Sequence, residues 1–126
     1  MPQIGTLGRK QDLLIKQGAD FWVRATLFSA ANVPVNLTNC VIRGGARKVL
    51  GADVLVPLNI EYLARSVGVY KFGFTKAQTA AMTCGLDIKS KESEYQWELE
   101  FEDSAGVVIP LFYGLGLVSR RLLNGI

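Results

Sequence analysis

Histidine is absent from the 126 residues, which removes the side chain that most often serves as a general base near neutral pH. Only two cysteines are present, and two cysteines without histidine cannot complete a tetrahedral zinc site within one chain. The Gly-Leu-Gly at residues 114–116 lacks the helix and the spacing that a phosphate-binding loop requires. These absences predict a protein that is not an enzyme and that uses no metal or other cofactor.

Long apolar runs are also missing. No stretch approaches the roughly 18 apolar residues of a membrane helix, and residues 1–12 lack the apolar segment of a secretory signal. We therefore expect a chain that is made and kept in a cytoplasm and has no membrane partner. In that compartment Cys40 and Cys84 are expected to be reduced thiols in or near the core, and a disulfide between them is the alternative.

The net charge of +3 is too small to predict a nucleic-acid partner. The charge is unevenly distributed along the chain, however. Residues 1–76 carry ten basic and four acidic side chains, whereas residues 77–126 carry four basic and seven acidic ones. A head-to-tail contact between copies would bring the two halves together, and ordinary scatter of surface charge is the alternative interpretation.

Alternation of apolar and polar residues is the main structural signal that is present. Residues 95–101, Tyr-Gln-Trp-Glu-Leu-Glu-Phe, place four large apolar side chains on one face and three polar ones on the other, which predicts a half-buried strand. Further strands are expected within residues 20–30, 35–50, 54–67, 69–75 and 107–118. Residues 54–67 also fit one or two helical turns, but we favour a strand there.

One short helical turn is expected near residues 76–83. Thr75 is suited to cap it, and Gln78 stands at the position that completes a capping box. The helix is too short to form a layer of its own. With about six or seven strands separated by turns and no alternation of strands with helices, the sequence predicts an all-β, antiparallel β-sandwich.

Glycine and proline mark irregular positions in these strands. Gly44 and Gly45 predict a bulge or a close approach by another backbone, and Pro110 predicts an edge or a bulge. Gly114 and Gly116 leave one strand face without side chains, so that something large can pack over it. We expect an N-terminal arm at residues 1–11, a sandwich domain at residues 12–119 and a C-terminal tail at residues 120–126.

The order of these patterns resembles a known family. The runs QGADF, VPVNLTN, GVYKFGFTKAQTAAM and YQWELEFEDSAGVVIPLFYGLGLVSR occur in that order between about residues 12 and 119. Together they are similar to the immunoglobulin-like β-sandwich module of bacteriophage tail and baseplate proteins, of which the N-terminal domain of the baseplate upper protein is one form. The positions that fit the late hairpin of this family are Tyr95, Trp97, Glu98, Leu99, Gly106, Gly114 and Val118. Gln96 departs from the acidic residue that is usual after the tyrosine.

This resemblance implies an immunoglobulin-like fold and a structural role in a virion, in the tail, baseplate or neck. The implied partners are further copies of the chain and other virion proteins, after synthesis in the host cytoplasm. A capsid decoration protein that stabilises the shell is the alternative within this class. A carbohydrate-binding adhesion module, which would take a surface glycan on exposed aromatic rings, is the alternative from another class.

Contacts with partners are expected at one strand face and at the two ends of the chain. Trp22 lies on the strand face opposite Phe21 and Val23, so we expect it to be exposed or to contact another chain. The two ends are expected to add a strand or fill a groove on a neighbouring subunit, and fraying is the alternative. The candidate interface residues are Arg9, Lys10, Trp22, Arg120 and Arg121. Glu98 and Glu100 share a strand face, which we interpret as a solvated, edge-protecting surface rather than a glycosidase pair.

Overall fold

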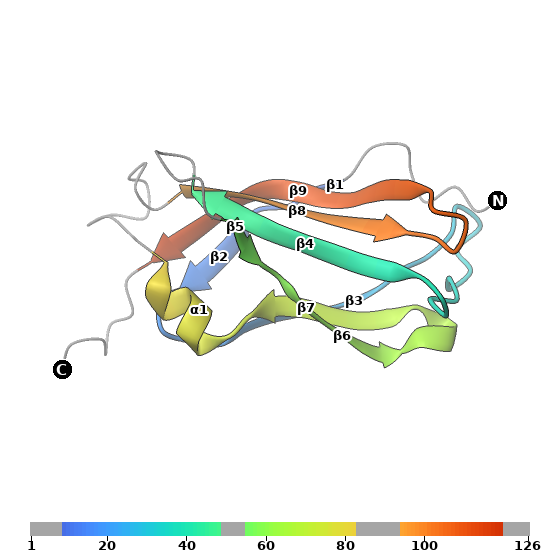
Figure 1. The fold of residues 1–126 in the computed structure, drawn as a ribbon, viewed down its shortest axis with the longest axis horizontal. Helices are drawn as coiled ribbons and strands as arrows, with labels where there is room; N and C mark the ends of the chain where they lie inside the picture. Colours follow the sequence, from blue (N-terminus) through green and yellow to red (C-terminus); the bar gives the residue numbers. More distant parts are fainter. Residues whose placement is uncertain (1–8, 49–54, 83–93, 120–126) are drawn as a thin grey trace.

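Nine strands form two facing sheets in the computed structural model, which describes residues 9–48, 55–82 and 94–119 (Figure 1). Sheet 1 has the order β1–β9–β8–β4–β5, with β2 also paired to β9, and sheet 2 has the order β3–β7–β6. The strands of sheet 1 are β1 (Arg9–Lys10), β2 (Leu13–Lys16), β4 (Val41–Lys48), β5 (Leu55–Pro57), β8 (Glu94–Glu102) and β9 (Val108–Ser119). Those of sheet 2 are β3 (Phe21–Thr26), β6 (Asn59–Ala64) and β7 (Val69–Phe74). The predicted all-β sandwich is confirmed.

Helix α1 (Lys76–Ala81) is the short helical turn that the sequence predicts. The Thr75 hydroxyl accepts a hydrogen bond from the Gln78 backbone N–H, and the Gln78 side chain accepts one from the Thr75 backbone N–H. This capping box is therefore confirmed, and the helix ends two residues before the expected limit of residue 83. Residue 83 itself lies outside the described residues.

The ambiguous segment at residues 54–67 contains both kinds of structure that its pattern allowed. Strands β5 and β6 take most of it, as favoured, and a single 3₁₀ turn, η1 (Arg65–Val67), follows them. Gly68 then adopts a left-handed conformation with φ of 75°, which lets the chain reverse into β7.

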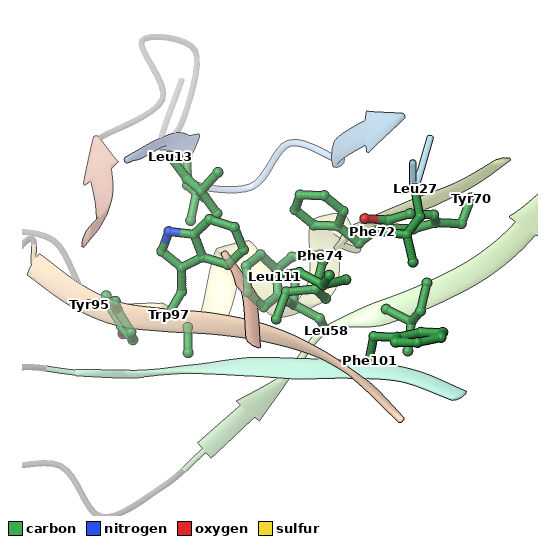
Figure 2. Packing of buried hydrophobic residues seen from close by; sticks show 14 of the residues in the cluster. Leu13, Leu27, Leu58, Tyr70, Phe72, Phe74, Tyr95, Trp97, Phe101 and Leu111 are labelled. Carbon is green, nitrogen blue, oxygen red and sulfur yellow. The ribbon is translucent and has the colours of Figure 1, made fainter. Parts of the chain in front are cut away.

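The core lies between β8 and β7. The four apolar side chains of residues 95–101 are buried as predicted, and they face the inward row of β7, where the exposed fraction is 2% or less (Figure 2). Trp97 of β8 stacks on Phe72 of β7, with ring centroids 5.6 Å apart and an interplanar angle of 18°. It also stacks on Phe112 of β9 at 6.2 Å. Aromatic contacts thus join the two sheets across the interior.

The irregular positions have distinct explanations. Leu99 pairs with Phe112 and Glu100 pairs with Pro110, so Leu111 is an extra residue and the proline marks a bulge. The bulge shifts the alternation of β9 by one residue, which allows both Leu111 and Phe112 to pack against the core. A Cβ at Gly44 would collide with the carbonyl oxygen of Glu98, so this glycine marks a close approach of neighbouring backbones.

Strands β1 and β2 run parallel to β9, whereas the other strand pairs are antiparallel. Two residues between β1 and β2 also bind β9. The Gln11 N–H donates to the Tyr113 carbonyl at 2.8 Å, and Asp12 Oδ1 accepts from the Leu115 N–H at 3.0 Å. A Cβ at Gly114 would collide with the Gln11 carbonyl oxygen. The space left by this glycine is therefore filled by the chain's own N-terminal segment.

That segment includes the last part of the expected N-terminal arm. Arg9 and Lys10 pair with β9 of the same chain, and residues 1–8 lie outside the described residues. The indole Nε1 of Trp97 donates a hydrogen bond of 2.7 Å to the Gln11 carbonyl, between β1 and β2. A buried side chain of β8 thus holds the N-terminal segment on β9.

Replacing Trp97 with phenylalanine tests this link. The variant keeps an aromatic ring but leaves the Gln11 carbonyl without its donor and opens a small cavity. We expect the free energy of unfolding to fall by about 2–3 kcal/mol in a urea titration. Trp22→Phe, at an exposed position, is the matched control and should cost less than about 1 kcal/mol. Equal losses in the two variants would contradict the role of Trp97.

Tyr70 provides a test at high pH. Burial raises the pKa of its phenol from 10.0 to about 12. The phenol therefore ionises more readily in the unfolded chain than in the folded one. The stability that the neutral Tyr70 contributes to the fold is fully present below pH 10 and is lost as the pH rises to 12. Across that interval the parent should lose about 2–3 kcal/mol of unfolding free energy more than Tyr70→Phe does. Parallel pH profiles for the two proteins, measured by denaturant unfolding, would show that Tyr70 does not titrate in this way.

Candidate assembly interface

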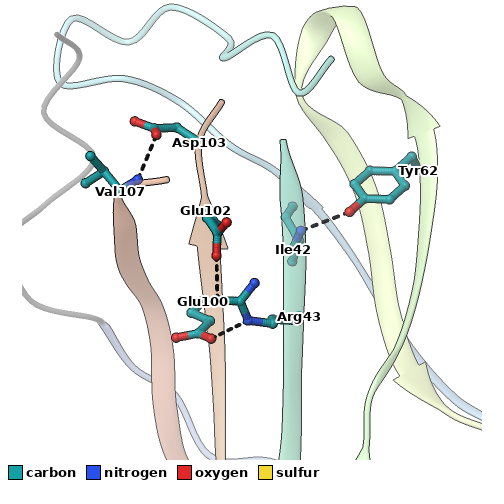
Figure 3. A network of polar contacts seen from close by, with 7 residues as sticks. All are labelled: Ile42, Arg43, Tyr62, Glu100, Glu102, Asp103 and Val107. Atoms are coloured by element: carbon teal, nitrogen blue, oxygen red, sulfur yellow. Dashed lines mark hydrogen bonds and ion pairs between the residues drawn. The ribbon is translucent and has the colours of Figure 1, made fainter. Parts of the chain in front are cut away.

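The two long sides of the sandwich are built differently. On the side formed by β4, β5 and β6, hydrogen bonds link the two sheets directly. The Ile42 N–H of β4 donates to the Tyr62 hydroxyl of β6 at 2.9 Å (Figure 3). The Leu58 N–H, between β5 and β6, donates to the Gly44 carbonyl at 2.8 Å. The guanidinium of Arg65 also packs on the Tyr62 ring, 3.7 Å from its centroid. Together these three contacts close this side of the sandwich within the chain.

The opposite side holds an open cleft of about 400 Å³ between β2 of sheet 1 and β3 of sheet 2. Its apolar lining consists mainly of Leu13, Phe21, Val23, Ala25, Phe72 and Phe112, and Asp12 and Arg24 also border it. The inward side chains of β3 are only partly buried, in contrast to the fully buried row on β7. The part of the chain that the structure describes therefore leaves some of the apolar interior uncovered along β3.

Strand β3 is also a regular sheet edge. Natural proteins usually blunt such edges with prolines, bulges or very short strands. Here β5 is three residues long and ends at Pro57, and β6 has an irregular register between Tyr62 and Ala64. Strand β3 has six residues with neither proline nor glycine, and its register with β7 is unbroken. Within residues 9–48, 55–82 and 94–119 no strand pairs with its outer edge, which is thus open to another strand.

The hydrogen-bond pattern shows which backbone groups of β3 point outward. The Leu27 N–H, just after β3, donates to the Gly68 carbonyl, just before β7. Bonded pairs alternate in an antiparallel ladder, so Val23 and Ala25 share their backbone bonds with β7. The backbone N–H and C=O groups of Trp22, Arg24 and Thr26 therefore point away from β7.

Trp22 lies on the outer face of sheet 2, as expected, with 38% of its surface exposed. Lys71 Nζ lies 4.5 Å from the centroid of its ring and 3.3 Å from Glu61 Oε2. A cation thus already covers part of the indole, which leaves less of the ring for stacking on a sugar. Part of the ring remains open to a further partner.

The other candidate residues are placed elsewhere. Arg9 and Lys10 are exposed on β1 of sheet 1, so the structure does not bring them into one cluster with Trp22. Arg120 and Arg121 lie outside the described residues. The interface role of all these residues stays a prediction. Arg24, which borders the cleft, is absent from the candidates although the alternation of residues 20–30 already places it on the Trp22 face.

The outer face of sheet 1 carries the acidic residues of β8. Arg43 of β4 forms ion pairs with Glu100 at 2.6 Å and with Glu102 at 2.8 Å (Figure 3). The hydrogen bonds that Arg43 donates to Glu102, the larger effect, and to Glu100 raise the pKa of its guanidinium above the usual value. Part of the charge difference between the two halves of the sequence is thus balanced within one chain. Glu98 and Glu100 share this outer face, as expected.

One of the two cysteines lies within the described residues. Cys40 is a buried free cysteine, as expected, and Cys84 lies outside the described residues. No group of three or more His, Cys, Asp or Glu side chains that could hold a metal ion occurs within residues 9–48, 55–82 and 94–119. Within the same ranges, no helix has the length and apolar character needed to cross a bilayer.

No family model matches this sequence, and no curated protein is significantly similar to it. The candidate interface is therefore defined by its geometry: an open cleft, and beside it a regular edge strand with outward-pointing backbone groups.

Tyr62→Phe tests the closed side of the sandwich. It removes the acceptor of the Ile42 N–H, and we expect the free energy of unfolding to fall by about 1–2 kcal/mol. Hydrogen exchange at the Ile42 amide should become faster at the same time. Tyr113→Phe, at an exposed tyrosine, is the control and should leave both quantities unchanged. Unaltered protection of Ile42 in the Tyr62 variant would show that the sheets are not joined there.

Proposed function

We propose that this protein is a structural subunit of a bacteriophage virion, in the tail, baseplate or neck, and that it assembles through the open side of its β-sandwich. Two independent lines support the proposal. The strand and turn patterns of the sequence resemble the β-sandwich module of phage tail and baseplate proteins. The cleft beside β3 provides an apolar surface and a strand edge for a neighbouring subunit.

The observation that carries the proposal is the contrast between the two sides of the sandwich. One side is sealed by hydrogen bonds between the sheets, whereas the other leaves inward side chains of β3 partly exposed next to an unprotected edge. A free monomer gains nothing from such an edge, which invites aggregation, but a subunit of an assembly buries it. The proposed partners are further copies of the chain and other virion proteins, and no catalytic role is proposed.

A glycan-binding adhesion module is the second candidate, and the exposed ring of Trp22 favours it. The ammonium group of Lys71 beside the same ring counts against it, because it occupies space that a stacked sugar would need. Binding to a glycan array separates the two functions. A specific glycan signal of the parent that is lost in Trp22→Ala would favour adhesion over assembly.

The proposal is tested on purified virions of the phage that encodes the chain. We expect mass spectrometry to detect the protein in intact particles, and cryo-electron microscopy to locate its copies in the tail, baseplate or neck. Copies on the capsid shell would support the decoration alternative and overturn the proposed location. A protein abundant in infected cells but absent from purified particles would overturn the structural role itself.

A further inference from the structure

We propose that β3 pairs antiparallel with β3 of a second copy about a twofold axis at Val23, joining two three-stranded sheets into one of six strands. The inference rests on the proposed assembly role and names the partner for its open side. The backbone N–H and C=O groups of Trp22, Arg24 and Thr26 point outward from sheet 2 and need hydrogen-bond partners. An added antiparallel strand satisfies these groups only when one of its own outward-pointing residues stands opposite each of them.

This requirement leaves two registers that pair five residues of each β3. The first places Arg24 opposite Arg24 of the second copy and Trp22 opposite Thr26. The second places Trp22 opposite Arg24, twice by symmetry, with Val23 opposite Val23 at the axis. Like charges directly opposite each other disfavour the first register. A guanidinium beside an indole is favourable, so the cation–π contact and the avoided charge repulsion both select the second register.

The inward face fits the same register. Phe21 comes to lie opposite Ala25 of the second copy, which pairs a large side chain with a small one on both sides of the axis. Phe21, Val23 and Ala25 are the partly buried residues of β3 that line the cleft. In the dimer they cover one another beneath β2, and the apolar surface that a single chain leaves open is removed from water.

Trp22 and Arg24 are available for this contact. Trp22 keeps 38% of its surface exposed beside Lys71, and Arg24 is exposed on the same face. Arg24 stands opposite Lys71 in the β3–β7 pair, so within a single chain it has a like-charged neighbour. Pairing with a second copy places this guanidinium against the part of the Trp22 ring that remains exposed beside Lys71, whose charge is paired with Glu61.

The first test is sedimentation equilibrium of the full chain over a range of concentrations. We expect a monomer–dimer equilibrium that Arg24→Glu weakens by about tenfold or more, because a carboxylate replaces each cation beside an indole. The substitution also places an acid opposite Lys71, which should preserve the fold; circular dichroism checks this. Arg47→Glu makes the same charge change at an exposed position on sheet 1 and should leave dimerisation unchanged. A strictly monomeric parent, or equal weakening by both variants, would overturn the proposal.

The register is tested by disulfide trapping. Val23 stands opposite itself in a non-bonded pair, where Cα atoms are about 4.5 Å apart, so Val23→Cys should form a covalent dimer under mild oxidation. Thr26→Cys is the control, because the register separates the two Thr26 positions by about 20 Å. The parent chain, treated in parallel, accounts for Cys40 and Cys84. Linkage of Thr26→Cys as efficient as that of Val23→Cys would exclude this register.

These outcomes are separate from those of the proposed function. A trapped β3 dimer of a protein that is absent from virions would overturn the virion role and leave the pairing intact. A protein found in virions with β3 against a different partner, or with β3 exposed, would overturn the pairing and leave the virion role intact.

Discussion

The indole of Trp97 is the contact on which the rest of the structure depends. Its ring stacks on Phe72 of the opposite sheet (Figure 2). It also stacks on Phe112 of the neighbouring strand, and its N–H donates a hydrogen bond to the Gln11 carbonyl. One side chain therefore joins the two sheets and holds the N-terminal segment on β9. The absence of a side chain at Gly114 makes this possible, because any Cβ there would collide with Gln11.

This arrangement has a consequence for the edges of the sandwich. Strands β1 and β2 are held on β9, and Tyr62 and Leu58 seal the side of β4 and β6. Among the described residues, no strand covers the outer edge of β3, and the cleft beside it reaches Phe72 and Phe112 of the core. The surface that we propose for a partner thus lies next to the edge of the packed core.

The sequence predicts those features that depend on neighbouring residues. Alternation over residues 95–101 gave the buried face of β8, and Thr75 with Gln78 gave the helix cap, because both signals act over a few positions. The parallel pairing of β2 with β9 joins residues about 100 positions apart, and no local pattern specifies it. Pro110 is compatible with either an edge strand or a bulge, and only the register between β8 and β9 shows that it marks a bulge. The cleft beside Arg24 lies between edge strands of two different sheets, so it depends on how the sheets pack and not on a local pattern.

Residue-resolved hydrogen exchange along β3 tests the central claim, an open edge on this strand, most directly. In dilute solution the account predicts that the amides of Trp22, Arg24 and Thr26 exchange quickly, whereas those of Val23 and Ala25, which face β7, are protected. Uniform protection of all five amides at every dilution would contradict it, because the edge would then be covered within a single chain.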